Sequence, residues 1–287
     1  MSLENSKKID KETRFEFGQN WSNFLSQIDE ARISQAEQSL RTFLKVDDLQ
    51  GRNFLDIGSG SGLFSLAARR LGANVHSFDF DLKSVNCTNE LRRRYFPGDS
   101  SWKVEQGSVL DDEYLEARGQ FDVVYSWGVL HHTGQMYKAF ANVAPIVAPG
   151  GKLFIAIYND QGFVSQYWHY VKLLYNSSAF IKLLMIAVHA PYLIGMRWAV
   201  RMLTGRLALP RGMSLWYDML DWLGGFPFEV ARPESVFQFF RNHDFFLIEL
   251  QTCGGRMGCN EFVFRKRAGF EVDEGVPVRD VESGLPP

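Results

Sequence analysis

The stretch RNFLDIGSGSGLFSLAARRLGANVHSFDFD, residues 52–81, decides the fold of this chain. It reads as a short apolar strand at 53–57, a glycine-rich turn, a helix over 63–71 and a second strand that ends at Asp79. Glycines let such a turn tighten and let its backbone approach a ligand that any Cβ atom would exclude. The amide N–H groups at the start of the helix then face that ligand. The stretch therefore predicts half of a nucleotide-binding βαβ unit.

The spacing of the glycines narrows this prediction. The dinucleotide-binding fingerprint is G-x-G-x-x-G, with an acid about 20 residues further on. Here Gly58, Gly60 and Gly62 give G-x-G-x-G, Leu63 stands where the fingerprint has its last glycine, and Asp56 precedes the first glycine by two positions. This variant resembles the first motif of class I S-adenosylmethionine-dependent methyltransferases. The alternatives are a turn whose glycines serve packing only, and a dehydrogenase that binds NAD.

The resemblance implies a site for S-adenosylmethionine at the carboxyl ends of the strands. In this family the acid at the Asp56 position helps to hold the methionine end, the glycines pass beneath the cofactor, and the acid at the Asp79 position binds both ribose hydroxyls. The position after the third strand commonly holds an aspartate near the adenine, whereas here it holds Ser108. The implied cofactor-binding residues are Asp56, Gly58, Ser59, Gly60, Gly62, Asp79, Phe80, Ser108, Val109, Ser126, Trp127 and Gly128.

Two adjacent histidines follow the fourth predicted strand, FDVVYS, in the sequence WGVLHHTG. Methyltransferases that modify exocyclic base amines carry D/N-P-P-Y/F here, and S-W-G-V departs from that pattern, so DNA is not an expected partner. The VLHHT run looks like the small-molecule O-methyltransferases of ubiquinone biosynthesis. A histidine can take the proton of a hydroxyl during methyl transfer. His132 is the first candidate for this base and His131 the second; alternatively, one caps the next helix and the other packs.

Composition bounds the class of protein. Of 287 residues, 46% are hydrophobic and 22% charged, and the formal net charge is -2. The chain is long enough for one large α/β domain with an elaboration, and its charge gives no global nucleic-acid signature. The three cysteines, Cys87, Cys253 and Cys259, are too few and too scattered for a disulfide framework or a zinc site. Together with an N-terminus that lacks an apolar signal region, this predicts a cytoplasmic protein without a bound metal.

The remaining pattern predicts an α/β fold: a Rossmann-like, seven-stranded methyltransferase sheet with helices on both faces, plus a helical insertion. After Asp81 a helix is expected to bury Leu82, Val85 and Leu91. Residues 149–151, Pro-Gly-Gly, are expected to form a turn before the fifth strand. The other elements are expected at 30–44, 102–106, 121–126, 135–147 and 153–158, from 233 onward, and in an antiparallel pair at 245–253 and 259–266.

Residues 161–225 depart from a minimal methyltransferase, which would reach its next helix within a few residues. The segment is apolar, aromatic and basic, and its charged residues are Lys172, Lys182, Arg197, Arg201, Arg206, Arg211, Asp218 and Asp221. Three interpretations remain open: a helical lid over the acceptor pocket, a dimer interface, or a peripheral contact of 163–211 with an anionic membrane that admits a lipid-like substrate. Charged residues and Pro191 interrupt the longest apolar run, so a membrane-spanning helix is not expected.

The pattern divides the chain into five parts. These are an N-terminal lid or cap (1–48), the cofactor-binding α/β core (49–160), the insertion (161–225), the C-terminal helix and hairpin of the core (226–267) and a disordered tail (268–287). An aromatic segment around Trp21 either covers the site as a lid or packs back as a satellite cluster. The candidate substrate-binding residues are Trp21, Tyr158, Asn159 and Arg256.

The sequence thus predicts an S-adenosylmethionine-dependent methyltransferase for a small-molecule, lipid-linked or glycan-linked acceptor, with O-methylation assisted by a histidine base. Two alternatives stay open. An RNA or protein methyltransferase needs a basic rim, which only the insertion supplies, and its binding would depend steeply on salt. A non-catalytic, methyltransferase-like partner module would bind the cofactor without turnover. The sequence determines neither the acceptor atom (O, N or C) nor the oligomeric state.

Overall fold

The computed structural model describes residues 28–196, 198, 202 and 215–268. One sheet forms its centre, in the strand order β3-β2-β1-β4-β5-β7-β6. The first five strands pair in parallel, and β7 runs antiparallel to β5 and to β6. The strands are β1 (Asn53–Ile57), β2 (Asn74–Asp79), β3 (Trp102–Gln106), β4 (Phe121–Trp127), β5 (Val147–Tyr158), β6 (Phe245–Gln251) and β7 (Cys259–Lys266).

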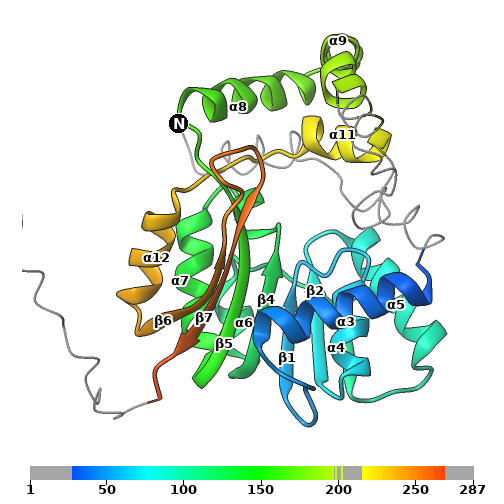
Figure 1. Ribbon diagram of the computed structural model, residues 1–287. Coiled ribbons are helices and arrows are strands. Elements are labelled where there is room, and N and C mark those ends of the chain that lie inside the picture. The colour runs from blue at the N-terminus through cyan, green and yellow to red at the C-terminus, as the bar shows by residue number, and fades with distance from the viewer. Residues whose placement is uncertain (1–27, 197, 199–201, 203–214, 269–287) are drawn as a thin grey trace, which may run out of the picture.

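Helices cover both faces of the sheet (Figure 1). One face carries α3 (Glu30–Leu44), α4 (Leu63–Arg70) and α5 (Leu82–Tyr95), and the other carries α6 (Asp112–Glu116), α7 (Met136–Ile146) and α12 (Pro233–Arg241). Side chains alternate along β1, so Phe54 packs in the first layer and Leu55 in the second. The predicted fold class, a Rossmann-like seven-stranded sheet with helices on both faces, is confirmed.

Two local predictions were wrong. Leu82 was expected to be buried, but it is the first residue of α5, directly after the N-cap Asp81, and 54% of its surface is exposed. The Pro-Gly-Gly sequence at 149–151 lies inside β5 and not in a turn before it. The pairing of β5 with β4 jumps from Val147 opposite Phe121 to Lys152 opposite Val123, so these residues form an irregularity within the strand.

The insertion is helical, as predicted, and its helices pack together at one end of the molecule (Figure 1). They are α8 (Phe163–Tyr175), α9 (Ala179–Ala190), a π-helical turn (Pro191–Met196) and α11 (Leu215–Gly224). A small core of their own holds them, in which Trp168, Val171 and Tyr175 of α8 meet Met219 and Leu223 of α11. Among the helices that the structure describes, none combines the length and apolarity that crossing a bilayer requires.

The two ends of the insertion are joined by a short clasp of backbone hydrogen bonds. Ala231 N–H donates to the carbonyl of Tyr158 at 3.0 Å, and Asp160 N–H donates to the carbonyl of Ala231 at 3.1 Å. Beside the clasp, Glu229 N–H donates to the carbonyl of His131 at 2.9 Å. The chain therefore leaves the sheet at the end of β5, forms the insertion and returns to the point of departure.

Candidate functional site

The glycine turn after β1 is shaped first by the protein's own packing. Gly58 has φ +74°, and a Cβ there would lie 2.5 Å from Cγ2 of Val129. Gly62 has φ +81°, and a Cβ there would lie 2.9 Å from Cα of Thr88. Both positions require glycine whether or not a ligand binds. The packing interpretation of these two glycines and the ligand interpretation of the turn are therefore compatible.

Asp79 ends β2 beside this turn and is held by two backbone donors. Gly60 N–H donates to its Oδ2 at 3.0 Å, and Asp81 N–H donates to its Oδ1 at 2.9 Å. A carboxylate oxygen can accept more than one hydrogen bond, so a carboxylate with backbone donors can also bind hydroxyls. An aspartate fixed in this way fits a vicinal diol, which presents two hydroxyl donors side by side.

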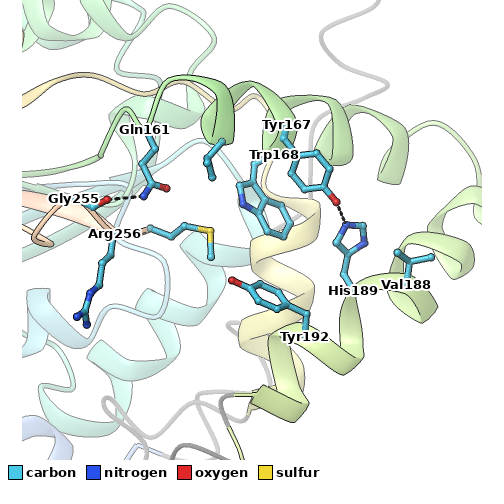
Figure 2. Close-up of a pocket in the computed structure, with 10 residues that line it drawn as sticks. Gln161, Tyr167, Trp168, Val188, His189, Tyr192, Gly255 and Arg256 are labelled. Atoms are coloured by element: carbon cyan, nitrogen blue, oxygen red, sulfur yellow. Dashed lines mark hydrogen bonds between the residues drawn. The ribbon is translucent and has the colours of Figure 1, made fainter.

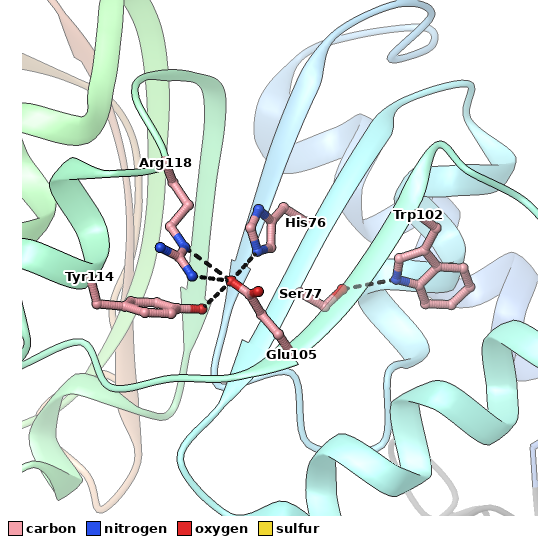
Figure 3. Close-up of polar contacts among 6 residues, drawn as sticks. All are labelled: His76, Ser77, Trp102, Glu105, Tyr114 and Arg118. Carbon is pink, nitrogen blue, oxygen red and sulfur yellow. Dashed lines mark hydrogen bonds and ion pairs between the residues drawn. The ribbon is translucent and has the colours of Figure 1, made fainter.

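Asp56 lies behind the turn at the end of a buried hydrogen-bond chain. Trp102 Nε1–H donates to Ser77 Oγ at 2.9 Å (Figure 3). Ser77 Oγ lies 2.7 Å from Ser65 Oγ. Ser65 Oγ–H in turn donates to Oδ2 of Asp56. The indole can only donate and an ionised carboxylate can only accept, so with Asp56 ionised the hydroxyl protons of both serines point toward it.

The carboxyl group of Asp56 has a pKa close to neutral pH. Burial raises the pKa of Asp56 from 3.8 to about 7; the Ser65 hydrogen bond opposes this rise and the nearby charge of Asp79 adds to it. At neutral pH the carboxyl is therefore about half ionised. A cation bound in front of the turn would favour the ionised form. This behaviour suits a group that faces the positively charged end of a ligand.

A second polar cluster ties β2, β3 and α6 together on the other face of the sheet (Figure 3). Glu105 accepts hydrogen bonds from Tyr114 at 2.6 Å, from Arg118 at 2.7 and 2.9 Å, and lies 2.8 Å from Nε2 of His76. Partial burial alone would raise the pKa of Glu105, but these three partners lower it to about 2. Three side chains converge on one oxygen of Glu105, so we assign this cluster to the scaffold.

The other predicted cofactor residues fall into two groups. Ser126 is fully buried and donates to the carbonyl of Ile57 at 3.3 Å, so it braces β4 against β1. Phe80 is about half exposed, and a Cβ built on Gly128 would meet no atom within 4 Å. Free space thus exists beside the carboxyl ends of β2 and β4. Ser59, Ser108, Val109 and Trp127 are buried or half-buried near the same ends.

His131 is fully buried at the foot of the insertion. Its ring lies 4.0 Å from the ring of Tyr158, centroid to centroid, and its Nδ1 accepts from Tyr158 N–H at 3.4 Å. Burial, followed by the neighbouring His132 and Lys172, lowers the pKa of His131 well below its usual value. The ring is therefore neutral at physiological pH and packs in the protein.

His132 is placed differently and retains slight exposure. Its Nδ1 lies 2.6 Å from the carbonyl oxygen of Pro227, which can only accept, so Nδ1 carries the proton. The lone pair of the neutral ring is then on Nε2. The structure thus brings both predicted histidines together with Tyr158, and it gives them opposite tautomers. Within the described ranges, no three His, Cys, Asp or Glu side chains gather as a metal site would require.

Lys172 was counted from the sequence only as part of the basic insertion, but it is fully buried. Its Nζ donates to the carbonyl of Trp222 near the C-terminal end of α11, and it lies 4.5 Å from the Trp222 ring and 4.8 Å from the Phe228 ring. A cation at a helix C-terminus is favoured by the helix dipole. The sequence did carry a signal, because Lys172 shares the i, i+4 spacing of the inner face with Trp168.

A cavity of about 750 Å³ opens between the insertion and the loop that joins β6 to β7 (Figure 2). Tyr167 and Trp168 of α8 line one side, where the Tyr167 hydroxyl lies 2.9 Å from Nε2 of His189. Tyr192 lines it as well, and Arg256 extends from the loop away from these rings (Figure 2). The sequence singled out Arg256 alone among these residues, because the others come together only through helix packing.

The other substrate candidates lie beside this cavity or outside the described residues. Tyr158 and Asn159 line a small crevice that shares Trp168 and Met257 with the cavity. Tyr158 also touches both histidine rings, so the crevice separates the cavity from His132. Asn159 accepts from Asn260 Nδ2 at 3.0 Å. Trp21 lies outside the residues that the structure describes.

One family model and several curated proteins match this chain. The family model described as a methyltransferase domain matches residues 28–199. The ubiquinone biosynthesis O-methyltransferase of Rhizobium etli is 32% identical over 111 residues, which cover 39% of this chain and 43% of that protein. Its counterpart in Bordetella avium is 34% identical over 112 residues, or 39% of this chain and 44% of that one.

The chain thus spans less than half the length of the curated relatives that it matches. Among solved structures, an O-methyltransferase family protein from Burkholderia thailandensis superimposes with a TM-score of 0.52 at 12% identity. The superposition covers 84% of this chain and 59% of that one. At this level of identity the likeness is one of fold.

Proposed function

This chain belongs to the methyltransferase-domain family, as a class I S-adenosylmethionine-dependent methyltransferase, and from that premise we propose that it methylates a hydroxyl group of a small molecule. The observation that carries the proposal is the tautomer of His132. Its Nδ1–H is fixed by the Pro227 carbonyl at 2.6 Å, which leaves Nε2 as the basic nitrogen. The names of the Rhizobium and Bordetella relatives, both O-methyltransferases, support an oxygen acceptor.

The cofactor is proposed to lie across the carboxyl ends of β1, β2 and β4. Asp79 accepts from the two ribose hydroxyls, and Phe80 and Val109 flank the adenine with Ser108. The glycine turn runs beneath the cofactor, and Asp56 attracts the charged methionine end from behind that turn. When bound, S-adenosylmethionine supplies an electrophilic methyl group; every other contribution comes from side chains of this protein.

His132 is proposed to act as the general base. Nε2 would take the hydroxyl proton of the acceptor when the methyl group passes from the sulfonium to that oxygen and the neutral thioether, S-adenosylhomocysteine, leaves. The Pro227 carbonyl would stabilise the resulting imidazolium through Nδ1–H. Proton transfer of this kind contributes roughly 10²- to 10⁴-fold in rate. His131 stays neutral and positions Tyr158 and the backbone beside His132, so we assign it a supporting role.

The acceptor is proposed to occupy the cavity between the insertion and the β6–β7 loop, with its reacting end directed past Trp168 and Tyr158 toward His132. Asn159 and Arg256 are the polar groups at the two ends of this path. A cavity of about 750 Å³ fits a small molecule. We also propose a cytoplasmic location and a peripheral contact of residues 163–211 with a membrane; the methyl transfer proposed above depends on neither.

Calorimetric titration with S-adenosylmethionine and, separately, with NAD tests the cofactor assignment. We expect binding of the first and none of the second. Extract fractions incubated with methyl-labelled cofactor then identify the acceptor, and we expect label in a small molecule that His132→Ala no longer modifies. Label in RNA or protein would replace the small-molecule acceptor, and cofactor binding without any labelled product would favour a non-catalytic partner module.

A further inference from the structure

The helix α9 is apolar on both sides. Its sequence is AFIKLLMIAVHA, and the one buried side chain in it is His189. On its inner side, Met185, Ile186 and Ala190 pack against the core of the insertion. A helix that is apolar all round is normally buried on all sides, within a protein or a membrane. Within the described part of the chain, nothing buries the second side of α9.

This second side of α9 carries exposed apolar residues at helical spacing. Phe180, Leu183, Leu184 and Val188 recur at i, i+3, i+4 and i+8, and Phe180 and Leu183 are 79% and 67% exposed. On α8, which packs against α9, Phe163 is 83% exposed and Tyr170 is also exposed. Proteins rarely leave contiguous apolar surface of this kind in water unless it binds something. These six residues define the outer apolar face.

The charge around this face indicates what covers it. From residue 161 to residue 217 the chain has no aspartate or glutamate, although it has 33 acidic residues in all. Lys182 lies exposed among the apolar residues of α9, with its Nζ 5.2 Å from the Tyr175 ring. Apolar and aromatic side chains with interspersed cations, and no anions, are the composition of helices that lie in the interface of anionic membranes.

A second copy of the chain is a poorer occupant. A twofold contact places the same surface of both subunits against each other, so it would bring together two acid-free surfaces, each with its exposed Lys182. The cost of apposing like charges would offset part of the gain from apolar burial. Docking on an anionic lipid surface is favoured both by burial of the apolar side chains and by attraction between Lys182 and the lipid headgroups.

We infer that the outer apolar face docks on the surface of an anionic lipid bilayer, with α9 lying in the interfacial layer. Val188 belongs to this face and also lines the cavity, together with Tyr167 and Tyr192. Docking therefore brings the cavity wall to the bilayer surface, and an acceptor dissolved in the bilayer reaches the cavity without crossing water. This last step rests on the proposed function, whereas docking itself does not.

Vesicle sedimentation tests the docking without any turnover. The full chain is mixed with phosphatidylcholine vesicles, with or without about 30% phosphatidylglycerol. We expect binding to the anionic vesicles that weakens at roughly 1 M salt. The double variant Phe180→Asp, Leu183→Asp should bind roughly tenfold more weakly or not at all. The matched control, Phe246→Asp with Leu250→Asp, adds the same charge on exposed residues of β6 and should bind like the wild type.

Three results would overturn the inference. The first is a sedimentation assay in which the wild-type chain does not bind anionic vesicles, or in which the two double variants bind them equally well. The second is a wild-type dimer that Phe180→Asp, Leu183→Asp dissociates, since a second copy would then cover the face. The third is vesicle binding that appears only after deletion of residues 1–27, which would make that segment the occupant. Calorimetry with S-adenosylmethionine, run on the same samples, separates failure of docking from failure of the proposed function.

Discussion

The glycine-turn region and the helical insertion differ in how their side chains are satisfied within the protein. Around the turn, the polar groups of Asp56 and Asp79 are held by partners inside the protein before any ligand arrives. In the insertion, the large side chains of α9 divide between an inner core and an outer face turned to solvent. The first region is complete in itself and only needs a ligand that fits it. The second leaves large apolar side chains of α9 exposed to water, where only a further partner could bury them.

This difference teaches where specificity resides. A pre-organised site pays little to order its groups when the ligand binds, so its affinity depends on a few fixed contacts. An apolar surface is tolerant of its partner's structure because the hydrophobic effect is non-directional. Substitution of Asp79 should therefore act mainly on the cofactor, whereas substitutions in the insertion should act on the acceptor and on stability.

The sharpest test of the pre-organised side is Asp79→Ala. We expect affinity for S-adenosylmethionine to fall roughly a thousandfold, because two hydrogen bonds to a charged acceptor are lost. Calorimetry measures the loss, and thermal unfolding should change little. Asp122→Ala is the matched control, since Asp122 also accepts a backbone N–H, from Asn53, but elsewhere on the sheet. Equal losses in the two variants would refute the ribose assignment.

His132→Ala probes the junction between the two regions. We expect kcat to fall roughly a hundredfold, with cofactor affinity unchanged, because the proposed base is lost and the cofactor contacts are not. His243→Ala, on an exposed histidine just after the end of α12, should leave kcat unchanged. Turnover in His132→Ala equal to that of the wild type would remove His132 from the mechanism.

Lys172→Ala tests the packing of the core of the insertion. We expect the free energy of unfolding to fall by about 2 to 4 kcal/mol, since the Trp222 carbonyl loses its donor and a cavity opens between the rings. Lys172→Met should recover part of this loss by filling the space. The exposed Lys182→Ala in the same insertion should change stability by less than about 0.5 kcal/mol. A Lys172→Ala chain as stable as Lys182→Ala would show that the inner side is loosely packed.

The smallest predicted effect is a release of protons on cofactor binding. Because Asp56 has a raised pKa of about 7, it is about half protonated at pH 7. A cationic ligand lowers that pKa, so binding should release up to about half a proton near pH 7 and almost none near pH 9. Calorimetry in two buffers of different ionisation enthalpy measures the release. Asp56→Asn should abolish it, and proton uptake at pH 7 would contradict the assignment.

The turn region could be predicted from sequence because its chemistry is local. Asp56, Gly58 and Asp79 lie within one βαβ unit, where short-range geometry determines their positions. The seven-stranded sheet and its antiparallel pair at 245–253 and 259–266 followed from the same resemblance. The error at Leu82 arose because periodicity predicts only the face of the helix on which a residue lies. Leu82 is the first residue of α5, and there its side chain projects past the edge of the sheet that the helix covers.

The insertion could be predicted only in outline. Its apolar composition indicated helices, but the pairing of Tyr167 with His189 depends on how α8 packs against α9, over 22 residues of separation. Lys172 was read by its charge, although its spacing from Trp168 placed it on the inner face. Long-range packing of this kind has no signature in local sequence, which is why the cavity emerged from the structure alone.

The clasp at Tyr158, Asp160 and Ala231 has an evolutionary consequence. It holds the entry and exit of the insertion together by hydrogen bonds of 3.0 and 3.1 Å, so the sheet ends at a closed junction whatever chain lies beyond it. The entropy of closing a loop grows only slowly, by about 0.6 kcal/mol for each doubling of its length. Descendants can therefore lengthen, trim or exchange everything above this junction and inherit the cofactor half unchanged. New acceptors become reachable by exchanging a module, without rebuilding an enzyme.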